Sequence, residues 1–186
     1  MNKKLKLFLG FLPLTTLCSL VFWFSAQNAD ESSLQSGVFV KFIKKYIIHS
    51  FSNINDPADE KIVDRVLSIV VRKCAHFTAY FLIGVCAFGA FWFISKKGLR
   101  FLIAVGGSAL YAGSDEIHQL FVAGRAGKLL DVFIDTSGAA TGALICLMVV
   151  LIIEMQEKKD EIDELKEKLR RYESGGRIKR RRNEEY

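Results

Sequence analysis

The chain has 186 residues, of which 51% are hydrophobic and 25% are charged, and its formal net charge is +6. Acidic residues are absent from residues 1–29 and 66–114, and about half of them lie beyond residue 153. Such segregation of charge argues against a soluble domain and indicates a membrane protein, because each charge at mid-bilayer costs about 3 kcal/mol.

Four apolar stretches are long enough to cross a membrane, since roughly 30 Å of hydrocarbon takes about 20 helical residues. They cover residues 5–24, 74–94, 99–121 and 129–153. The first follows a run of lysines, as a signal peptide does, but its length and the three later stretches favour a retained anchor. We therefore predict an all-α polytopic membrane protein, with a four-helix membrane domain over residues 1–153 and a charged helical tail over residues 154–186.

The basic residues predict the orientation of this bundle. They gather before the first span, between the second and third spans at Lys96, Lys97 and Arg100, and in the tail. The positive-inside rule then places both termini in the cytoplasm. Basic residues between the first and second spans oppose this orientation, but that segment is long enough for the rule to weaken, and it also carries acidic residues.

The segment between the first and second spans predicts two interfacial helices. Residues 30–33 are typical helix caps, and residues 37–51 are amphipathic in the way of a helix that lies in the headgroup layer. Asp56 and Pro57 form a strong start for the second of these helices. We expect that helix to continue directly into the second span.

The tail predicts a charged helix over residues 154–172 that ends at Gly175 and Gly176. Its apolar residues have heptad-like spacing, at Met155, Ile162, Leu165, Leu169 and Tyr172. The run is short, which favours a solvated extension of the fourth span over a zipper that forms a homodimer. The basic cluster at Arg177 and residues 179–182 is expected near anionic lipid, and no nucleic acid is expected because no nucleic-acid-binding domain accompanies it.

Polar residues form a stripe on each of three predicted spans, because residues three or four apart share a helix face. The stripe of the second span consists of Arg72, His76 and Tyr80. That of the third consists of Ser108, Tyr111, Asp115, His118 and Gln119, with Glu116 beside it. That of the fourth consists of Asp131, Asp135, Gly138 and Gly142. The short loop of residues 122–128 joins the third and fourth spans, so we expect the stripes to meet toward the outer face.

Small residues support this meeting of helices. Gly138 with Gly142, and Ala109 with Gly113, predict two seams along which helix backbones approach closely. Polar residues would then face one another instead of lipid.

Each polar residue taken alone also has a simpler explanation. Arg72 and Lys73 would extend to the interface, and the aspartates of the fourth span would cap it or pair with Arg125. The whole set of carboxylates, histidines and glutamine exceeds what capping needs, and His118 is the member most readily incidental.

Four motifs carry a family resemblance. They are Arg72-Lys73-Cys74-Ala75-His76-Phe77 with Tyr80, Asp115-Glu116-Ile117-His118-Gln119-Leu120-Phe121 with Arg125, Leu130-Asp131-Val132 with Gly138, and Phe24-Ser25-Ala26-Gln27. The chain resembles the VanZ-like membrane proteins over most of its length to about residue 153, although many members carry glutamate at the place of Ala79 and asparagine at that of Asp135. The resemblance implies a protein of the bacterial plasma membrane, in a family whose named member is linked to teicoplanin resistance.

Three functions remain open for the polar cluster. The first is binding of an amphiphilic lipid-linked or glycopeptide-type molecule at the outer leaflet, with an effect on glycopeptide sensitivity. The residues expected to bind it are Arg72, Lys73, Tyr80, Gln119, Arg125, Asp131 and Asp135. The second is an intramembrane hydrolase or transferase that uses His76, Asp115 and Glu116 in acid–base chemistry on a lipid-linked envelope substrate. The third is a proton-linked transporter element.

No cofactor is expected from the sequence. The four cysteines show no metal-like pairing and are interpreted as apolar packing residues. A metal site of His76, Asp115, Glu116, Asp131 and Asp135 is a subordinate version of the enzyme hypothesis, because no two-histidine ligand motif supports it.

Overall fold

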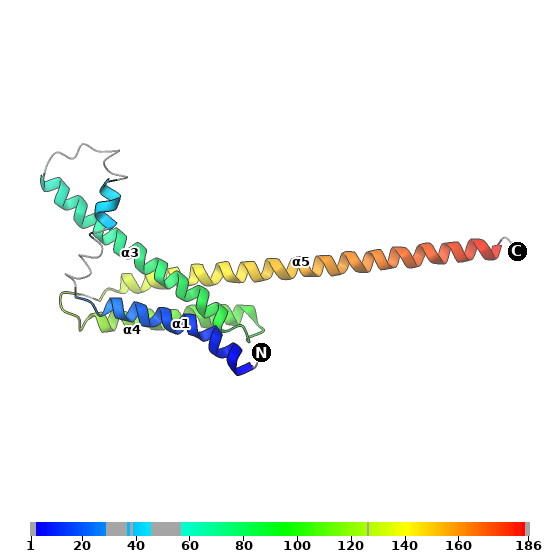
Figure 1. Ribbon diagram of the computed structural model, residues 1–186, viewed down its shortest axis with the longest axis horizontal. Coiled ribbons are helices and arrows are strands. Elements are labelled where there is room, and N and C mark those ends of the chain that lie inside the picture. Colours follow the sequence, from blue (N-terminus) through cyan, green and yellow to red (C-terminus); the bar gives the residue numbers. More distant parts are fainter. Residues whose placement is uncertain (1–2, 29–36, 38, 46–56, 126, 185–186) are drawn as a thin grey trace. The chain divides into compact units, whose positions relative to one another are not determined.

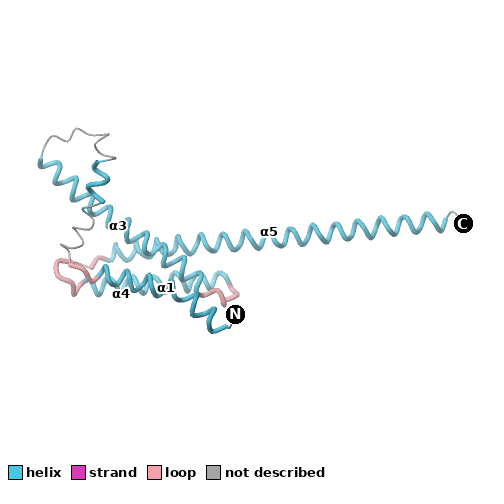
Figure 2. Tube along the Cα trace, viewed as in Figure 1, coloured by secondary structure: helices cyan, strands magenta, loops and turns pink. Residues whose placement is uncertain are grey.

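The computed structural model describes residues 3–28, 37, 39–45, 57–125 and 127–184, without the side chains of residues 3–4, 6, 57–60 and 173–184. Its long helices are α1 (Lys3–Ser25), α3 (Pro57–Ala90), α4 (Lys97–Gln119) and α5 (Leu129–Glu184) (Figure 1). Residues 39–45 form a further short helix, and the described residues contain no strand (Figure 2). The predicted all-α fold is confirmed.

Helix α3 begins at Pro57 and runs without a break to Ala90, as predicted from the proline at its first turn. The expected second span over residues 74–94 ends earlier than predicted, because residues 91–93 form a turn. The proposed cap at residues 30–33 and Asp56 lie outside the described residues. The amphipathic segment of residues 37–51 is described only at residue 37 and residues 39–45, and these are helical.

Within the described part of the chain, three helices are long and apolar enough to cross a membrane, over Leu7–Ser25, Lys61–Ala90 and Leu129–Tyr172. They indicate a multi-pass membrane protein. Helix α4 is not among them, because polar residues such as Ser108, Asp115 and Gln119 lower its hydropathy. A fourth span over residues 99–121 therefore stays a prediction.

The chain divides into two units, Met1–Leu147 and Met148–Tyr186. In the second unit, α5 carries charge pairs one turn apart, between Lys168 and Glu164 at 2.6 Å and between Arg171 and Glu167 at 2.5 Å. The predicted helix end at Gly175 and Gly176 is wrong, since α5 continues to Glu184. Neither glycine adopts the positive φ with which glycine ends many helices. The side chains of the basic cluster after them lie outside the described residues.

In the first unit, glycines bring the backbones of α3 and α5 into direct contact. A Cβ atom added at Gly138 would overlap the carbonyl oxygen of Phe77, and one at Gly142 would overlap that of Phe81. Only glycine fits such positions, so the predicted seam of the fourth span is confirmed. The predicted seam at Gly113 is not formed, because a Cβ atom there would meet nothing within 4 Å.

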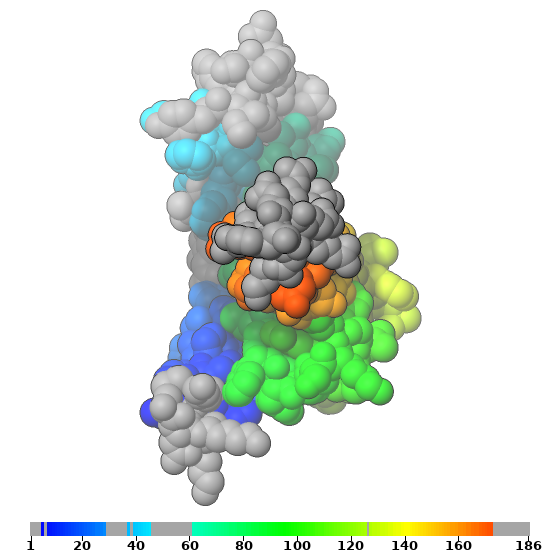
Figure 3. Space-filling view, turned by 90° about the vertical axis from the view of Figure 1, so that its right-hand side faces the viewer, coloured from blue at the N-terminus to red at the C-terminus, as the bar shows by residue number. Residues whose placement is uncertain are grey.

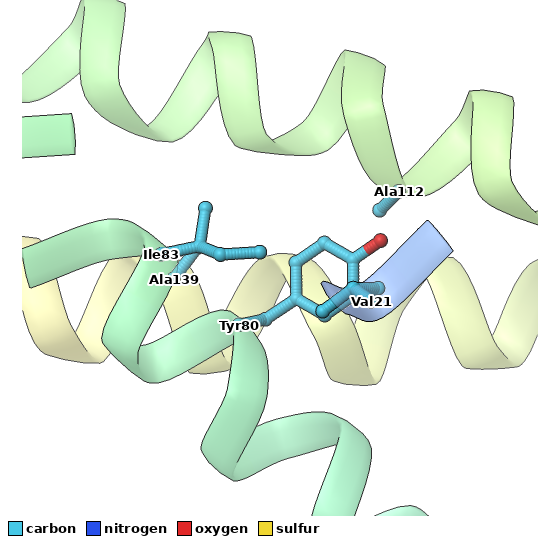
Figure 4. Packing of buried hydrophobic residues seen from close by; sticks show 5 residues of the cluster. All are labelled: Val21, Tyr80, Ile83, Ala112 and Ala139. Carbon is cyan, nitrogen blue, oxygen red and sulfur yellow. The ribbon is translucent and has the colours of Figure 1, made fainter. Parts of the chain in front are cut away.

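A small buried core joins four helices of this unit. It contains Val21 of α1, Tyr80 and Ile83 of α3, Ala112 of α4 and Ala139 of α5 (Figure 4). The Tyr80 ring lies between the helices, and its hydroxyl points toward Ala112. The small alanines at two of the other four positions let α4 and α5 approach this one large ring.

Helix α1 contacts its neighbours at more than one point along its length. The Tyr111 hydroxyl of α4 donates a hydrogen bond to the Cys18 carbonyl at 2.6 Å. The rings of Phe11 and Phe91 meet edge to face with centroids 5.4 Å apart, where the surface of α1 adjoins the segment that joins α3 to α4 (Figure 3). These contacts place the end of α1, at Ser25, beside the polar ends of the other helices.

Candidate binding site

The loop between α4 and α5 closes one end of the bundle. Gly124 has a φ of 75°, which permits the sharp turn, and the backbone N–H of Lys128 donates to Glu116 Oε2 at 2.8 Å. A Cβ atom at Gly127 would lie 2.9 Å from the Glu116 carbonyl oxygen, so the loop packs tightly on the end of α4. Glu116 is therefore turned toward the loop, where it orders the start of α5.

A chain of hydrogen bonds links three helices beneath this loop. Ser25 Oγ of α1 donates to Asp115 Oδ2 at 2.8 Å, and Gln119 Nε2 donates to the same oxygen at 3.1 Å. Arg72 Nη2 of α3 donates in turn to Gln119 Oε1 at 3.4 Å. Ser25, Asp115 and Gln119 are all buried, so these bonds hold their side chains in fixed orientations.

Two further pairs join α3 to α5. Lys73 Nζ forms a salt bridge with Asp131 Oδ1. One turn deeper, His76 Nδ1 lies 3.5 Å from Asp135 Oδ2. Lys73 is thus neutralised by its partner, whereas Arg72 contacts a neutral amide.

These residues surround a polar cavity of about 240 Å³. Most of the predicted site residues line it, namely Arg72, Lys73, His76, Glu116, Gln119, Arg125, Asp131 and Asp135. The convergence that the helical stripes predicted is therefore present in the structure. Among the described residues of the cavity, Arg72, Arg125 and Lys128 form no ion pair with a described carboxylate, and Glu116 forms none with a described cation, so the lining carries charges of both signs.

A second, apolar cavity of about 330 Å³ adjoins the first. Its walls include Val21 and Phe24 of α1, Val71, Ala75 and Ala79 of α3, and Phe39 of the short helix. Arg72, His76 and Arg125 line both cavities. The two spaces therefore meet at these three side chains, and the pair offers a charged compartment next to an apolar one.

Arg125 lies where the two cavities adjoin. Its Nη2 donates to the Phe24 carbonyl at 3.4 Å, while its Nε and Nη1 are buried without a hydrogen-bond partner among the described residues. Burial lowers the pKa of Arg125, and the nearby charge of Arg72 lowers it further, whereas Asp115 and Glu116 raise it. A guanidinium with two unused donors beside a second guanidinium is a site that an anion would stabilise.

The short helix of residues 39–45 covers the apolar cavity. Phe39 lines that cavity, and Lys44 Nζ forms a 2.8 Å salt bridge with Asp64 Oδ1 of α3. Figure 3 shows the short helix lying against the first part of α3. The amphipathic character of this segment thus has a use within the protein, in addition to any contact with lipid.

Two of the predicted site residues lie elsewhere. Tyr80 is fully buried in the apolar core and lines neither cavity. Asp115 does not line either cavity but lies directly behind Gln119, to which it is hydrogen-bonded. His118, which we considered incidental, packs its ring edge to face with Phe22 at 4.5 Å between centroids.

Sequence reasoning missed Ser25, Lys128 and Phe39 as members of the site. Ser25 and Gln27 follow the apolar run of α1, and two polar residues at the end of a span were an available signal. Lys128 and Phe39 gave no such signal, because their roles depend on how the loop and the short helix fold back.

Comparisons with known proteins identify the family of the chain. Neither the curated proteins nor the solved structures gave a match. The VanZ/LLP1 family model matches residues 10–152, a range that contains every residue named above as lining the two cavities. The chain therefore belongs to the VanZ/LLP1 family.

Proposed function

We propose that this membrane protein binds an anionic amphiphile, with a phosphate or carboxylate group in the polar cavity and an apolar part in the apolar cavity. The observation that carries the proposal is the meeting of the two cavities at Arg72, His76 and Arg125. A molecule with one end in each cavity would accept hydrogen bonds from the unused guanidinium donors and would also fill the apolar space.

The charge of the site selects the ligand class. Lys73 is paired with Asp131, so the described cations of the polar cavity without an ion pair are Arg72, Arg125 and Lys128. The flat donor arrays of the two arginines suit the oxygens of phosphate and carboxylate. A lipid-linked cell-wall precursor and a lipoglycopeptide both carry such a group beside an apolar chain.

We further propose that the site faces the outer leaflet, with both termini in the cytoplasm, and that binding changes sensitivity to teicoplanin. The orientation is supported by Lys96, Lys97 and Arg100 at the start of α4 and by the basic residues of the tail. The effect on teicoplanin is what the family resemblance implies.

Cells that produce the wild-type protein are expected to differ from empty-vector cells in their minimal inhibitory concentration of teicoplanin. Arg125→Ala should abolish that difference, because it removes the buried donors at the junction. Arg65→Ala is the matched control, since Arg65 is exposed on α3 and lines neither cavity. Membrane levels of the three proteins are compared by immunoblot. Equal sensitivity of wild-type, Arg125→Ala and empty-vector cells would refute the proposed role in sensitivity.

A second candidate function is hydrolysis of a phosphate-linked lipid. It is favoured by His76, which lines both cavities and lies 3.5 Å from Asp135, where it can accept a proton from water. Water would add to phosphorus, the bond from phosphorus to the leaving oxygen would break, and His76 would return the proton to that oxygen. Release of inorganic phosphate from undecaprenyl diphosphate by purified protein, absent in His76→Gln, would support it. Release at background level by the wild-type protein would eliminate it for this lipid.

A further inference from the structure

Three potential metal ligands from three different helices meet beside the polar cavity. His76 belongs to α3, Asp115 to α4 and Asp135 to α5, and one ligand atom of each lies within 4.8 Å of the others. The sequence argued against a metal because it contains no paired-histidine motif. The structure shows why such a motif is not needed, since the ligands are assembled across the bundle and not along one helix.

The two aspartates are buried without enough hydrogen-bond donors. Asp135 is 0% exposed and Asp115 is 1% exposed. Both oxygens of Asp135, and Oδ1 of Asp115, accept no hydrogen bond from the described residues. The basic group nearest to them is His76, whose Nδ1 lies 3.5 Å from Asp135 Oδ2, while Lys73 contacts Asp131 and Arg72 contacts Gln119. Buried carboxylates without full compensation are strongly unfavourable, so two of them beside a single histidine favour the binding of a positive ion.

The geometry around these atoms suits a small divalent ion. Zinc binds nitrogen and carboxylate oxygen at about 2.0–2.1 Å in a tetrahedral arrangement, which separates neighbouring ligand atoms by about 3.4 Å. The distance from His76 Nδ1 to Asp135 Oδ2 is 3.5 Å. The remaining ligand atom, an oxygen of Asp115, belongs to the same group of atoms within 4.8 Å of one another.

The surroundings of Asp115 resemble the outer shell of a metal site. Ser25 Oγ and Gln119 Nε2 both donate to Oδ2, which orients the carboxylate and leaves Oδ1 free. Ligating carboxylates in metalloproteins are commonly oriented by such hydrogen bonds. Ser25, which the sequence did not mark as a site residue, thus orients one of the three ligands.

We propose that His76, Asp115 and Asp135 bind one divalent transition-metal ion, with zinc as the ion whose ligand preferences fit best. Three protein ligands leave a fourth position open, and because His76 and Asp135 line the polar cavity, that position faces the cavity. A phosphate oxygen or a water molecule would occupy it. The ion would add a positive charge beside the polar cavity, which Arg72 and Arg125 also line. Its binding would not depend on the amphiphile.

The experiment uses the full-length protein purified in detergent through a tag without histidines. Samples are dialysed against micromolar zinc and then against metal-free buffer, and zinc per chain is measured by mass spectrometry of the digested protein. The wild type is expected to keep about one zinc ion per chain. Asp135→Asn and His76→Gln should each weaken zinc binding at least about tenfold, because each removes a ligand. His118→Gln and Asp64→Asn are matched controls outside the cluster and should retain the ion.

Folding of each variant is checked by circular dichroism and by its elution from a sizing column. A second measurement needs no variant: cobalt added to the metal-free wild type should give the visible absorption of a four-coordinate site, and zinc should abolish it. The proposal is overturned if the wild type retains no zinc and shows no cobalt absorption, or if both ligand variants retain zinc as the wild type does. Both readouts are taken without lipid, so a failure of amphiphile binding would leave this result separate.

Discussion

Tyr80 shows how position along a helix decides the role of a polar residue. It shares a face with Arg72 and His76, but each step of four residues moves about 6 Å along the helix axis, so Tyr80 lies about 12 Å beyond Arg72. At that depth it meets Val21, Ile83 and Ala112 instead of the polar cavity. Its hydroxyl has no hydrogen-bond partner among the described residues, although its ring is fully buried.

We therefore expect Tyr80→Phe to change the free energy of unfolding by no more than about 0.5 kcal/mol, because no hydrogen bond is lost. Tyr111→Phe is the matched comparison, and it should cost about 1 kcal/mol because it removes the donor to the Cys18 carbonyl. Both are measured by thermal unfolding in the same detergent. A loss for Tyr80→Phe as large as that for Tyr111→Phe would mean that the Tyr80 hydroxyl does have a partner.

The polar residues near the helix ends were more predictable from the sequence than Tyr80 was. Arg72, Lys73 and Asp131 lie near helix ends, where a charged stripe has few other places to point, and the short loop forces α4 and α5 together. Ser25 and Phe39 were not predictable in the same way, because their contacts join segments far apart in the sequence. Periodicity indicates the face of one helix, but it does not indicate which helix that face will meet.

At the scale of elements, the seam between α3 and α5 determines whether the site forms. His76 and Asp135 approach each other because Gly138 and Gly142 let the two backbones touch just below them. The sequence predicted this seam from the glycine spacing alone. It also predicted a seam at Gly113, which does not form, because a small residue permits a close approach without requiring one.

Gly142→Ala is expected to destabilise the protein by about 1–3 kcal/mol, because the new methyl group would overlap the Phe81 carbonyl and push the helices apart. Gly113→Ala introduces the same group in α4 with nothing within 4 Å, so it should be neutral or stabilise by up to about 1 kcal/mol. Thermal unfolding in detergent distinguishes the two. Equal melting temperatures for both variants would contradict the close packing of α3 on α5.

Helix α5 continues past the helix end that its two glycines predict. Two consecutive glycines normally favour a stop, yet α5 continues through them to Glu184. The preceding turns contain charge pairs such as Glu164 with Lys168, which support the helix locally. Local support of this kind can extend a helix past a weak stop signal.

At the scale of the whole molecule, the number of membrane spans depends on whether α4 crosses the membrane. Its length of 23 residues is sufficient for a span, and it keeps Leu102, Leu110 and Ile117 exposed at 65%, 80% and 60%. Its buried residues Asp115, Glu116 and Gln119 bond to the loop, to α1 and to α3 instead. A helix with these features can cross the membrane, and a crossing by α4 remains the prediction of the sequence.

Single cysteines in a background without the native cysteines test this topology. Ala123→Cys, in the exposed α4–α5 loop, should react with a membrane-impermeant thiol reagent in intact cells. Lys96→Cys, before α4, and Glu157→Cys, in the tail, should react only after the membrane is permeabilised. Labelling of Ala123→Cys and Lys96→Cys from the same side would show that α4 does not cross the membrane.

The most direct test of the account compares three ligands that separate the charged group from the apolar chains. Purified protein in detergent is titrated with dioleoyl phosphatidic acid, with dioleoylglycerol and with glycerol 3-phosphate, and binding is followed by native mass spectrometry. We predict that phosphatidic acid binds at least about tenfold more tightly than either of the others, and that Arg125→Ala but not Arg65→Ala removes this preference. Equal binding of phosphatidic acid and dioleoylglycerol, or binding unaffected by Arg125→Ala, would contradict the proposed anionic amphiphile site.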